Sequence, residues 1–270
     1  MALSTLRDFV FDWTATVAST GGVLASLVAF DVIQRVAIRR GNEAHQRAVS
    51  AMAAMTNRAY ALTGGRTRAT GTHHAQPGKP YIIVSNHQSM FDISLISEYL
   101  GFLQPRYVSK RENAKLIPGV SYNLKHGGSA LIDRGDPDQA HAAIEDVARR
   151  MVSDGWSVVI FPEGTRSRTG ALKPFREGGL RTLIANAPGV SVLPVTMTGG
   201  ARLFARNIRP VVRNVDLAMQ VHAPIEAADP QDPEAFRAFL RKLEEIIGGA
   251  IPPESILPEK SLPARRRKFA

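Results

Sequence analysis

The chain has 270 residues, of which 44% are hydrophobic and 21% charged, so it is long enough to bury the core of one large α/β domain or two small ones. The absence of cysteine excludes a disulfide scaffold, thiolate metal sites and a cysteine nucleophile. The net charge of +10 favours an anionic partner, such as an acidic membrane surface or a phosphorylated ligand. No RNA-binding signature is present and only 7% of residues are aromatic, so no nucleic acid is expected as a partner.

The N-terminal region, residues 1–63, is predicted to consist of membrane-associated helices. Residues 13–30 form a run without charge, slightly shorter than the roughly 20 apolar residues that span a bilayer. The run is preceded by Asp8 and Asp12 and followed by Arg35, Arg39 and Arg40. Three interpretations are open: an interfacial or half-inserted helix, a helix that spans the bilayer, and an ordinary buried helix. Apolar residues at three- and four-residue steps in 31–62 predict the second arm of a helical hairpin, either packed in the core or lying on lipid.

The region after the hairpin is predicted to be a linker followed by an α/β domain. Residues 64–80 are rich in Gly, Thr and Pro and are predicted to be the linker. Residues 81–250 alternate short apolar segments with amphipathic ones, which predicts a largely parallel sheet flanked by helices. Strands are expected at 81–85, 106–109, 129–134, 156–161, 191–197 and 216–225, and helices at 92–100, 137–154, 179–187 and about 236–247. Residues 251–270 form a Pro-rich tail whose basic cluster, ARRRKF at 264–269, is expected to have affinity for anionic surfaces.

The segment SNHQSMFD (85–92) places a histidine and an aspartate where the first strand of this domain turns into a helix. There Asp92 could accept a hydrogen bond from His87, fix its tautomer and stabilise the imidazolium. The alternative is that Asp92 is an N-cap or first-turn acid and His87 a polar turn residue. The same spacing recurs in HAAIED (141–146), but there both residues lie within one helix, roughly 140° apart, and cannot touch.

Two further strand ends carry groups suited to binding a phosphate. FPEGTRSRTG (161–170) and LIDRGD (131–136) each follow a predicted strand, and the carboxyl ends of parallel strands meet at one edge of a sheet. The candidate residues are Arg134, Glu163, Gly164, Thr165, Arg166 and Arg168. Arginine is a planar donor for phosphate, and glycine permits close approach of the backbone. Taken singly, each segment could be a surface turn with solvated charges; together with His87 they predict a shared pocket.

These segments together resemble the lysophosphatidic acid acyltransferase family, the glycerolipid acyltransferases with an NH-x4-D motif. The similarity covers about residues 85–200, with the blocks in the family's order. The blocks are NHQSMFD, the stretch from Lys110 through IPGV to GGSALIDR, FPEGTRS with LKPFREGG, and VLPVTMTG. The second block, with KLIPGVSYN, matches the family's Lys, Pro and Gly spacing only loosely.

The resemblance implies that His87, oriented by Asp92, removes the proton from an acceptor hydroxyl that attacks a fatty acyl thioester directly. Arg134 and Arg166 would then hold the acceptor's phosphate, and residues 163–165 (Glu163, Gly164 and Thr165) would shape the acceptor site. The implied activity is that of a 1-acylglycerol-3-phosphate O-acyltransferase, which makes phosphatidic acid from lysophosphatidic acid in phospholipid synthesis.

The same resemblance implies an acyl-CoA or acyl carrier protein thioester as co-substrate, with no cofactor and no metal. The enzyme would work at the cytoplasmic face of the inner or plasma membrane, on an anionic surface. Residues 1 to about 60 are expected to dock it there rather than to build its active site. Two alternatives remain open: an acyltransferase for another lyso-lipid such as lyso-ornithine lipid, and a catalytically silent membrane-binding protein.

Overall fold

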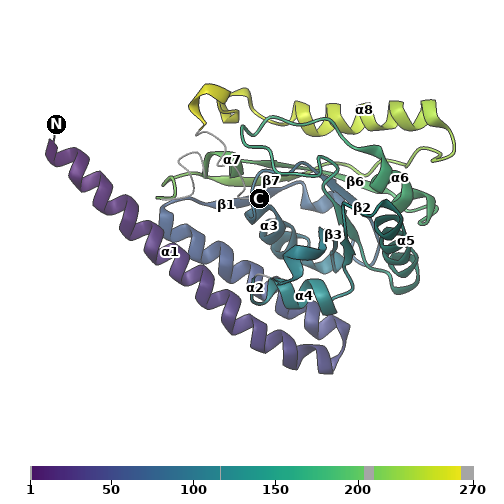
Figure 1. The fold of residues 1–270 in the computed structure, drawn as a ribbon, viewed down its shortest axis with the longest axis horizontal. Coiled ribbons are helices and arrows are strands. Elements are labelled where there is room, and N and C mark those ends of the chain that lie inside the picture. The colour runs from purple at the N-terminus through teal and green to yellow at the C-terminus, as the bar shows by residue number, and fades with distance from the viewer. Residues whose placement is uncertain (1, 116, 204–209, 263–270) are drawn as a thin grey trace.

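A helical hairpin and a three-layer α/β domain make up the chain (Figure 1). In this computed structural model, residues 2–115, 117–203 and 210–262 are described, so the basic cluster at 264–269 lies outside the described residues. The long helix α1 (Ala2–Ala37) runs along one side of the molecule, and α2 (Asn42–Tyr60) lies between it and the domain (Figure 1).

The sheet has seven strands in the order β1-β7-β6-β2-β5-β3-β4. Their bounds are Thr67–Thr70 for β1, Ile82–Ser85 for β2, Arg106–Lys110 for β3, Ala130–Ile132 for β4, Val158–Ile160 for β5, Val192–Thr198 for β6 and Leu217–Val221 for β7. Every pair is parallel except β6 with β7, which is antiparallel. The prediction of a largely parallel sheet flanked by helices is therefore confirmed.

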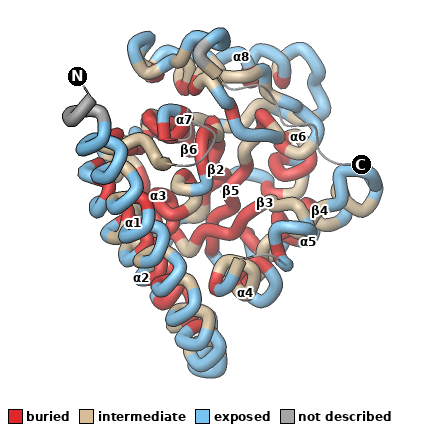
Figure 2. Tube along the Cα trace, turned by 60° about the vertical axis from the view of Figure 1, so that its left-hand side comes forward, coloured by how far each residue is buried: buried red, intermediate tan, exposed pale blue. Residues whose placement is uncertain are grey.

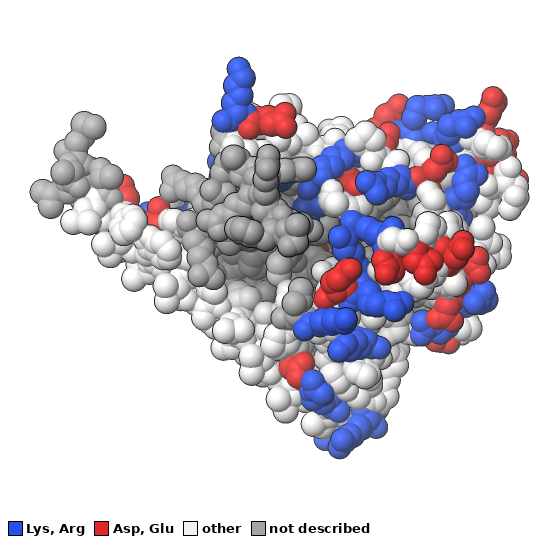
Figure 3. Space-filling model, in the orientation of Figure 1, with Lys and Arg blue, Asp and Glu red and all other residues white. Residues whose placement is uncertain are grey.

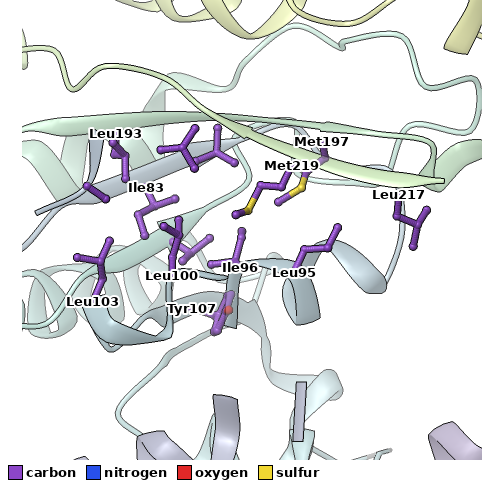
Figure 4. Packing of buried hydrophobic residues seen from close by; sticks show 14 of the residues in the cluster. Ile83, Leu95, Ile96, Leu100, Leu103, Tyr107, Leu193, Met197, Leu217 and Met219 are labelled. Atoms are coloured by element: carbon purple, nitrogen blue, oxygen red, sulfur yellow. The ribbon is translucent and has the colours of Figure 1, made fainter. Parts of the chain in front are cut away.

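Helices cover both faces of the sheet, because successive side chains of the buried strands point to opposite faces. Ile83 packs with Leu95 and Ile96 of α3 (Phe91–Tyr99) on one face (Figure 4). Ile82 and Val84 belong to the core of the other face. That core is completed by α5 (Pro137–Asp154), α6 (Glu177–Ala185) and α8 (Pro233–Gly249). Two short helices, α4 (Val120–His126) and α7 (Gly200–Leu203), complete the described helices other than the 3-10 turns.

The predicted linker is not free of regular structure. Thr67–Thr70 forms the edge strand β1, which pairs in parallel with β7. The sequence TRAT carries no run or alternation of large apolar side chains, so its strand character could not be read from hydrophobicity. Helix α4 was not predicted either, because its 7 residues are too few to show a helical periodicity.

The hairpin turns later than predicted. Helix α1 (Ala2–Ala37) continues past residue 31, a 3-10 turn covers Ile38–Arg40, and α2 spans Asn42–Tyr60. The two helices are separated by Gly41, whose φ of 104° is a conformation that residues with a side chain rarely adopt. The helical periodicity in 31–62 therefore belongs to two helices, and the predicted start of the second arm at residue 31 is wrong.

Helix α1 exposes apolar side chains and buries small polar ones. Most of α1 is coloured as exposed in Figure 2. Its exposed residues include Leu6, Phe9, Val10, Val17, Leu24, Val28 and Val32. Thr16, Ser19 and Ser26 are buried, and a Cβ added to Gly22 would lie 3.0 Å from Ala59 Cβ of α2. Segment Leu6–Arg40 is long and apolar enough to cross a membrane by length and composition, and only 17% of its most apolar window is buried. An ordinary buried helix therefore does not describe α1.

Candidate active site

His87 and Asp92 are in contact. The loop after β2 brings His87 Nδ1 within 2.8 Å of Asp92 Oδ2 at the start of α3. The same carboxylate oxygen accepts hydrogen bonds from the backbone N–H groups of Gln88 at 2.6 Å and Ser89 at 2.9 Å. Asp92 is therefore both a first-turn acid that holds the loop and the partner of His87, so the two interpretations of this residue are compatible.

His87 has further contacts besides the one with Asp92. Its ring stacks on Phe161, with the ring centroids 4.3 Å apart. Its backbone N–H donates to Glu163 Oε1 at 2.7 Å, and its carbonyl accepts from the N–H of Ser167 at 2.7 Å. Because Asp92 occupies Nδ1, the remaining ring nitrogen, Nε2, is the one left to accept a proton from a substrate.

The second His/Asp pair has no such geometry. His141 Nδ1 lies 2.7 Å from Thr182 Oγ1, and Asp146 pairs with Arg150 at 2.7 Å. Both side chains belong to α5 and bond to different partners, which confirms the prediction that they do not touch.

Glu163 is a buried acceptor that joins two segments of the site. One carboxylate oxygen accepts from the His87 N–H and the other from the Lys173 N–H at 3.3 Å. Burial raises the pKa of Glu163 to about 7, against the opposing effect of the hydrogen bond from His87. Glu163 does not line the cavity described below, so it shapes the site by holding the His87 loop rather than by facing a ligand.

Two arginines project into the same site. Arg134 donates a hydrogen bond to the carbonyl of Gly164, and partial burial lowers the pKa of its guanidinium, as does the positive charge of Arg176. Neither Arg134 nor Arg166 makes an ion pair with a carboxylate in the described parts of the chain. Lys173 Nζ donates to the carbonyls of Thr165 and Arg166 and so fixes the loop that carries Arg166. The two guanidinium groups are available for an anion.

A cavity of about 460 Å³ joins these groups to an apolar interior. Its polar lining includes His87, Lys110, Arg134, Gly164, Thr165 and Arg166, together with the uncharged polar residues Thr56, Ser94, Ser97, Ser109, Asn113 and Asn123. One apolar wall is contributed by the hairpin through Val23, Leu27, Val49, Met52 and Ala53. The rest of the apolar lining includes Phe91, Ile93, Val108, Ile117, Val120 and Leu124. A cavity that combines cationic side chains with a largely apolar lining fits an amphiphile with an anionic head group.

The contribution of the hairpin to this cavity corrects one expectation. Residues 1 to about 60 were expected to dock the protein on a membrane rather than to build the active site, but α1 and α2 supply a wall of the cavity. The Met and Ala stripe of α2, which includes Met52 and Ala53, was the sequence signal for a packed helix. Its partner surface could not be identified from the sequence, because the cavity also draws on segments more than 100 residues away.

The site carries no sign of a resident metal. Among residues 2–115, 117–203 and 210–262, no three His, Asp or Glu side chains are grouped so that they could hold an ion.

On the face seen in Figure 3, basic side chains form a band across the body of the molecule, whereas α1 presents a largely uncharged surface.

Comparison with known proteins finds one matching family model. The family model described as Acyltransferase matches residues 66–198. The chain is 30% identical over 184 residues to the 1-acyl-sn-glycerol-3-phosphate acyltransferases alpha of Ovis aries and Homo sapiens, covering 67% of this chain and 62% of each relative. It is 34% identical over 175 residues to 1-acyl-sn-glycerol-3-phosphate acyltransferase of Cocos nucifera, covering 63% of this chain and 54% of the relative. The chain thus spans less than two thirds of the length of these curated relatives.

A solved structure has the same fold. The crystal structure of the 1-acyl-sn-glycerophosphate (LPA) acyltransferase PlsC from Thermotoga maritima is similar with a TM-score of 0.65, at 21% sequence identity. The match covers 90% of this chain and 97% of that chain. The similarity therefore includes much of the helical hairpin as well as the α/β domain.

Proposed function

On the match of residues 66–198 to the acyltransferase family model, we propose that this chain is an acyltransferase and moves a fatty acyl group from an acyl thioester to the free hydroxyl of lysophosphatidic acid. The product would be phosphatidic acid, a precursor in phospholipid synthesis. The observation that carries the proposal is the His87–Asp92 pair, 2.8 Å apart, with His87 lining the same largely apolar cavity as Arg134 and Arg166.

The proposed reaction needs one base and no covalent enzyme intermediate. His87 Nε2 takes the proton from the acceptor hydroxyl as its oxygen attacks the thioester carbonyl carbon, and Asp92 stabilises the imidazolium. The tetrahedral intermediate collapses with cleavage of the C–S bond. The leaving thiolate then takes the proton from the imidazolium, which restores neutral His87 and gives a free thiol. No metal or cofactor takes part in this sequence.

The acceptor is proposed to bind through its phosphate. Arg134 and Arg166 would each donate charge-assisted hydrogen bonds to phosphate oxygens, beside the backbone of Gly164 and Thr165. The transferred acyl chain would lie in the apolar part of the cavity, against Met52 and the other hairpin residues. Both acyl-CoA and acyl carrier protein are anionic donors compatible with the net charge of +10.

The hairpin is proposed to bring this cavity to a membrane. The apolar side chains exposed on α1 would enter the bilayer or its interface, and Arg39 and Arg40 at the turn would meet anionic head groups at about 1 kcal/mol each. Small residues of α1 meet α2, because Gly22 lies close to Ala59 and Ser26 donates to the carbonyl of Met52. This supports the arrangement, since helices packed in lipid commonly meet through Gly, Ser and Thr. Because the acceptor is a membrane lipid made inside the cell, the cytoplasmic face of the inner or plasma membrane is the proposed location.

A panel of acceptors tests the proposal and its main alternative. Purified full-length protein in lipid vesicles would be assayed with lysophosphatidic acid, lysophosphatidylcholine and lyso-ornithine lipid, using acyl-CoA and acyl carrier protein donors separately. Preferred transfer to lysophosphatidic acid is expected, because Arg134 and Arg166, which form no ion pair with a carboxylate among the described residues, match a phosphate monoester. Transfer only to lyso-ornithine lipid, which lacks phosphate, would replace the proposed acceptor. Absence of transfer to every lyso-lipid would leave a membrane-binding protein without this activity.

A further inference from the structure

One carboxylate of α1 is bonded to the loop that forms part of the cavity wall. Asp31 Oδ1 accepts the backbone N–H of Gly119 at 2.8 Å, and Asp31 Oδ2 accepts Arg35 Nε at 2.8 Å. Gly119 stands between Ile117 and Val120, which both line the cavity. Asp31 directly follows the charge-free run 13–30, and its partner lies 88 residues further along the chain.

The backbone at Gly119 is inserted tightly between the two hairpin helices. Its φ is +69°, and a Cβ there would lie 2.6 Å from Met52 Sδ and 2.9 Å from the carbonyl oxygen of Leu27. Leu27 and Met52 themselves line the cavity. The bond from Gly119 to Asp31 therefore acts where the loop wall meets the hairpin wall.

A second contact joins α1 to the helix that follows this loop. The guanidinium carbon of Arg35 lies 4.6 Å from the centre of the Tyr122 ring in α4. The next two residues of α4, Asn123 and Leu124, line the cavity. Asp31 and Arg35, one helical turn apart and bonded to each other, thus hold the loop and the start of α4 against α1.

We propose that Asp31 is a positioning residue that determines acyl-chain specificity: its bond to Gly119 fixes the loop wall of the cavity against the hairpin. The inference rests on the proposed function, because it requires the transferred acyl chain to occupy the cavity. The strands of the sheet are held by their own backbone hydrogen bonds, whereas residues 117–119 precede α4 and have this side chain as an anchor on α1. Without the anchor, the loop wall moves away from Leu27 and Met52, and chains of different length fit more nearly equally well.

The experiment compares Asp31→Ala with Asp31→Asn in the full-length protein. Values of kcat/KM are measured with saturated acyl-CoA donors of increasing chain length and one acceptor, lysophosphatidic acid, and thermal melts are recorded alongside. In Asp31→Ala the preference for the best chain over its neighbours is expected to fall by about threefold or more, since apolar pockets distinguish single methylene groups. In Asp31→Asn the preference is expected to persist, because the amide oxygen still accepts the Gly119 N–H.

A matched control is available on α2. Glu43 and Arg47 form an exposed ion pair of the same i,i+4 type at 2.7 Å, and among the described residues neither side chain is bonded to residues 117–119. Glu43→Ala is expected to keep the wild-type chain-length profile. If Asp31→Ala is too unstable to assay, Asp31→Ser tests the same bond, because a helical serine folds its hydroxyl back onto its own helix.

The possible outcomes separate this inference from the proposed function. If the wild type acylates lysophosphatidic acid with a chain-length preference and Asp31→Ala retains that preference, the role of Asp31 is refuted and the proposed function stands. A uniform loss of rate with an unchanged profile also refutes it, because it reports stability rather than wall position. A wild type without chain-length preference overturns it as well. A wild type without transfer to lysophosphatidic acid refutes the proposed function itself.

Discussion

The carboxylate of Glu163 accepts the backbone N–H of His87 at 2.7 Å, so the loop that carries the proposed base is held by a buried acid from the neighbouring strand end. Asp92 orients the imidazole ring of His87, and Glu163 holds the main chain of the same residue. Two acidic side chains from different strand-to-helix connections thus fix one histidine. Only Asp92 touches the ring, which separates their roles in the variants below.

Replacing Glu163 by Gln should lower stability in a pH-dependent way. The glutamine side chain has one oxygen that can accept a hydrogen bond, and its NH2 group would face the backbone N–H of His87 or of Lys173. The free energy of unfolding should therefore fall by about 1–3 kcal/mol. Burial raises the pKa of Glu163 to about 7 from the ordinary value of 4.5, so the folded protein holds this proton more tightly than the unfolded chain. The contribution of Glu163 to stability is then fully present below pH 4.5 and is lost as the pH rises through about 7.

The measurement is the urea concentration at the unfolding midpoint, for the wild type and for Glu163→Gln, at a series of pH values from 4.5 to above 7. The advantage of the wild type should shrink as the pH rises. A difference that stays constant across the range would show that Glu163 does not titrate there.

His87→Ala should abolish most turnover while leaving the fold intact, because the side chain is bonded to Asp92 and stacked on Phe161 without forming part of the core clusters. A positioned general base contributes about 10²–10⁴-fold, which sets the expected loss in kcat. His141→Ala, with its ring bonded to Thr182 in another part of the domain, is the matched control and should keep wild-type activity. Activity in His87→Ala equal to that of the control would end the proposed mechanism.

Asp92→Asn should reduce the rate less than His87→Ala does. The amide oxygen can still accept the bonds that the loop and the ring donate to Asp92 Oδ2, but the negative charge opposite the imidazolium is lost. The expected signature is a fall in kcat at unchanged thermal stability. A fall in stability as large as the fall in rate would instead assign Asp92 to the loop alone.

Position along the chain explains why the sequence predicted this pair but not the cavity around it. His87 and Asp92 flank one strand-to-helix turn, so a strand at 81–85 and a helix from about 92 were sufficient to bring them together. The core strands were predictable because their side chains are almost entirely apolar, whereas the polar edge strand Thr67–Thr70 was not. The wall made by Leu27 and Met52 depends on how the hairpin packs against the domain, and no local pattern records that packing.

Arg166→Lys should weaken acceptor use although the charge is kept. Lysine loses the planar fork that binds two phosphate oxygens, and a charge-assisted hydrogen bond is worth about 1.5–3 kcal/mol, or about ten- to a hundredfold in kcat/KM. Arg134→Lys should cost more, because Arg134 also donates to the carbonyl of Gly164 and supports the loop. Steady-state kinetics with varied lysophosphatidic acid measure both variants. An unchanged acceptor KM and rate in Arg166→Ala would refute the phosphate assignment.

The exposed apolar side chains of α1 provide a test of membrane docking that does not require truncation. Removal of the whole hairpin would open the cavity and break the bonds of Asn57 in α2 to Ser94 and Glu98 in α3, at 2.6 and 2.5 Å, so loss of activity after truncation would be ambiguous.

Val17 and Val28 are 66% and 50% exposed, and their replacement by Glu should leave folding almost unchanged. The double variant should bind anionic vesicles less well in sedimentation assays and turn over long-chain acceptors in vesicles more slowly. Its turnover of a short-chain, water-soluble acceptor should be maintained. Val152→Glu, at an apolar residue of α5 that is 51% exposed, is the matched control and should sediment like the wild type. If the double variant still sediments fully with the vesicles, α1 is not the docking surface.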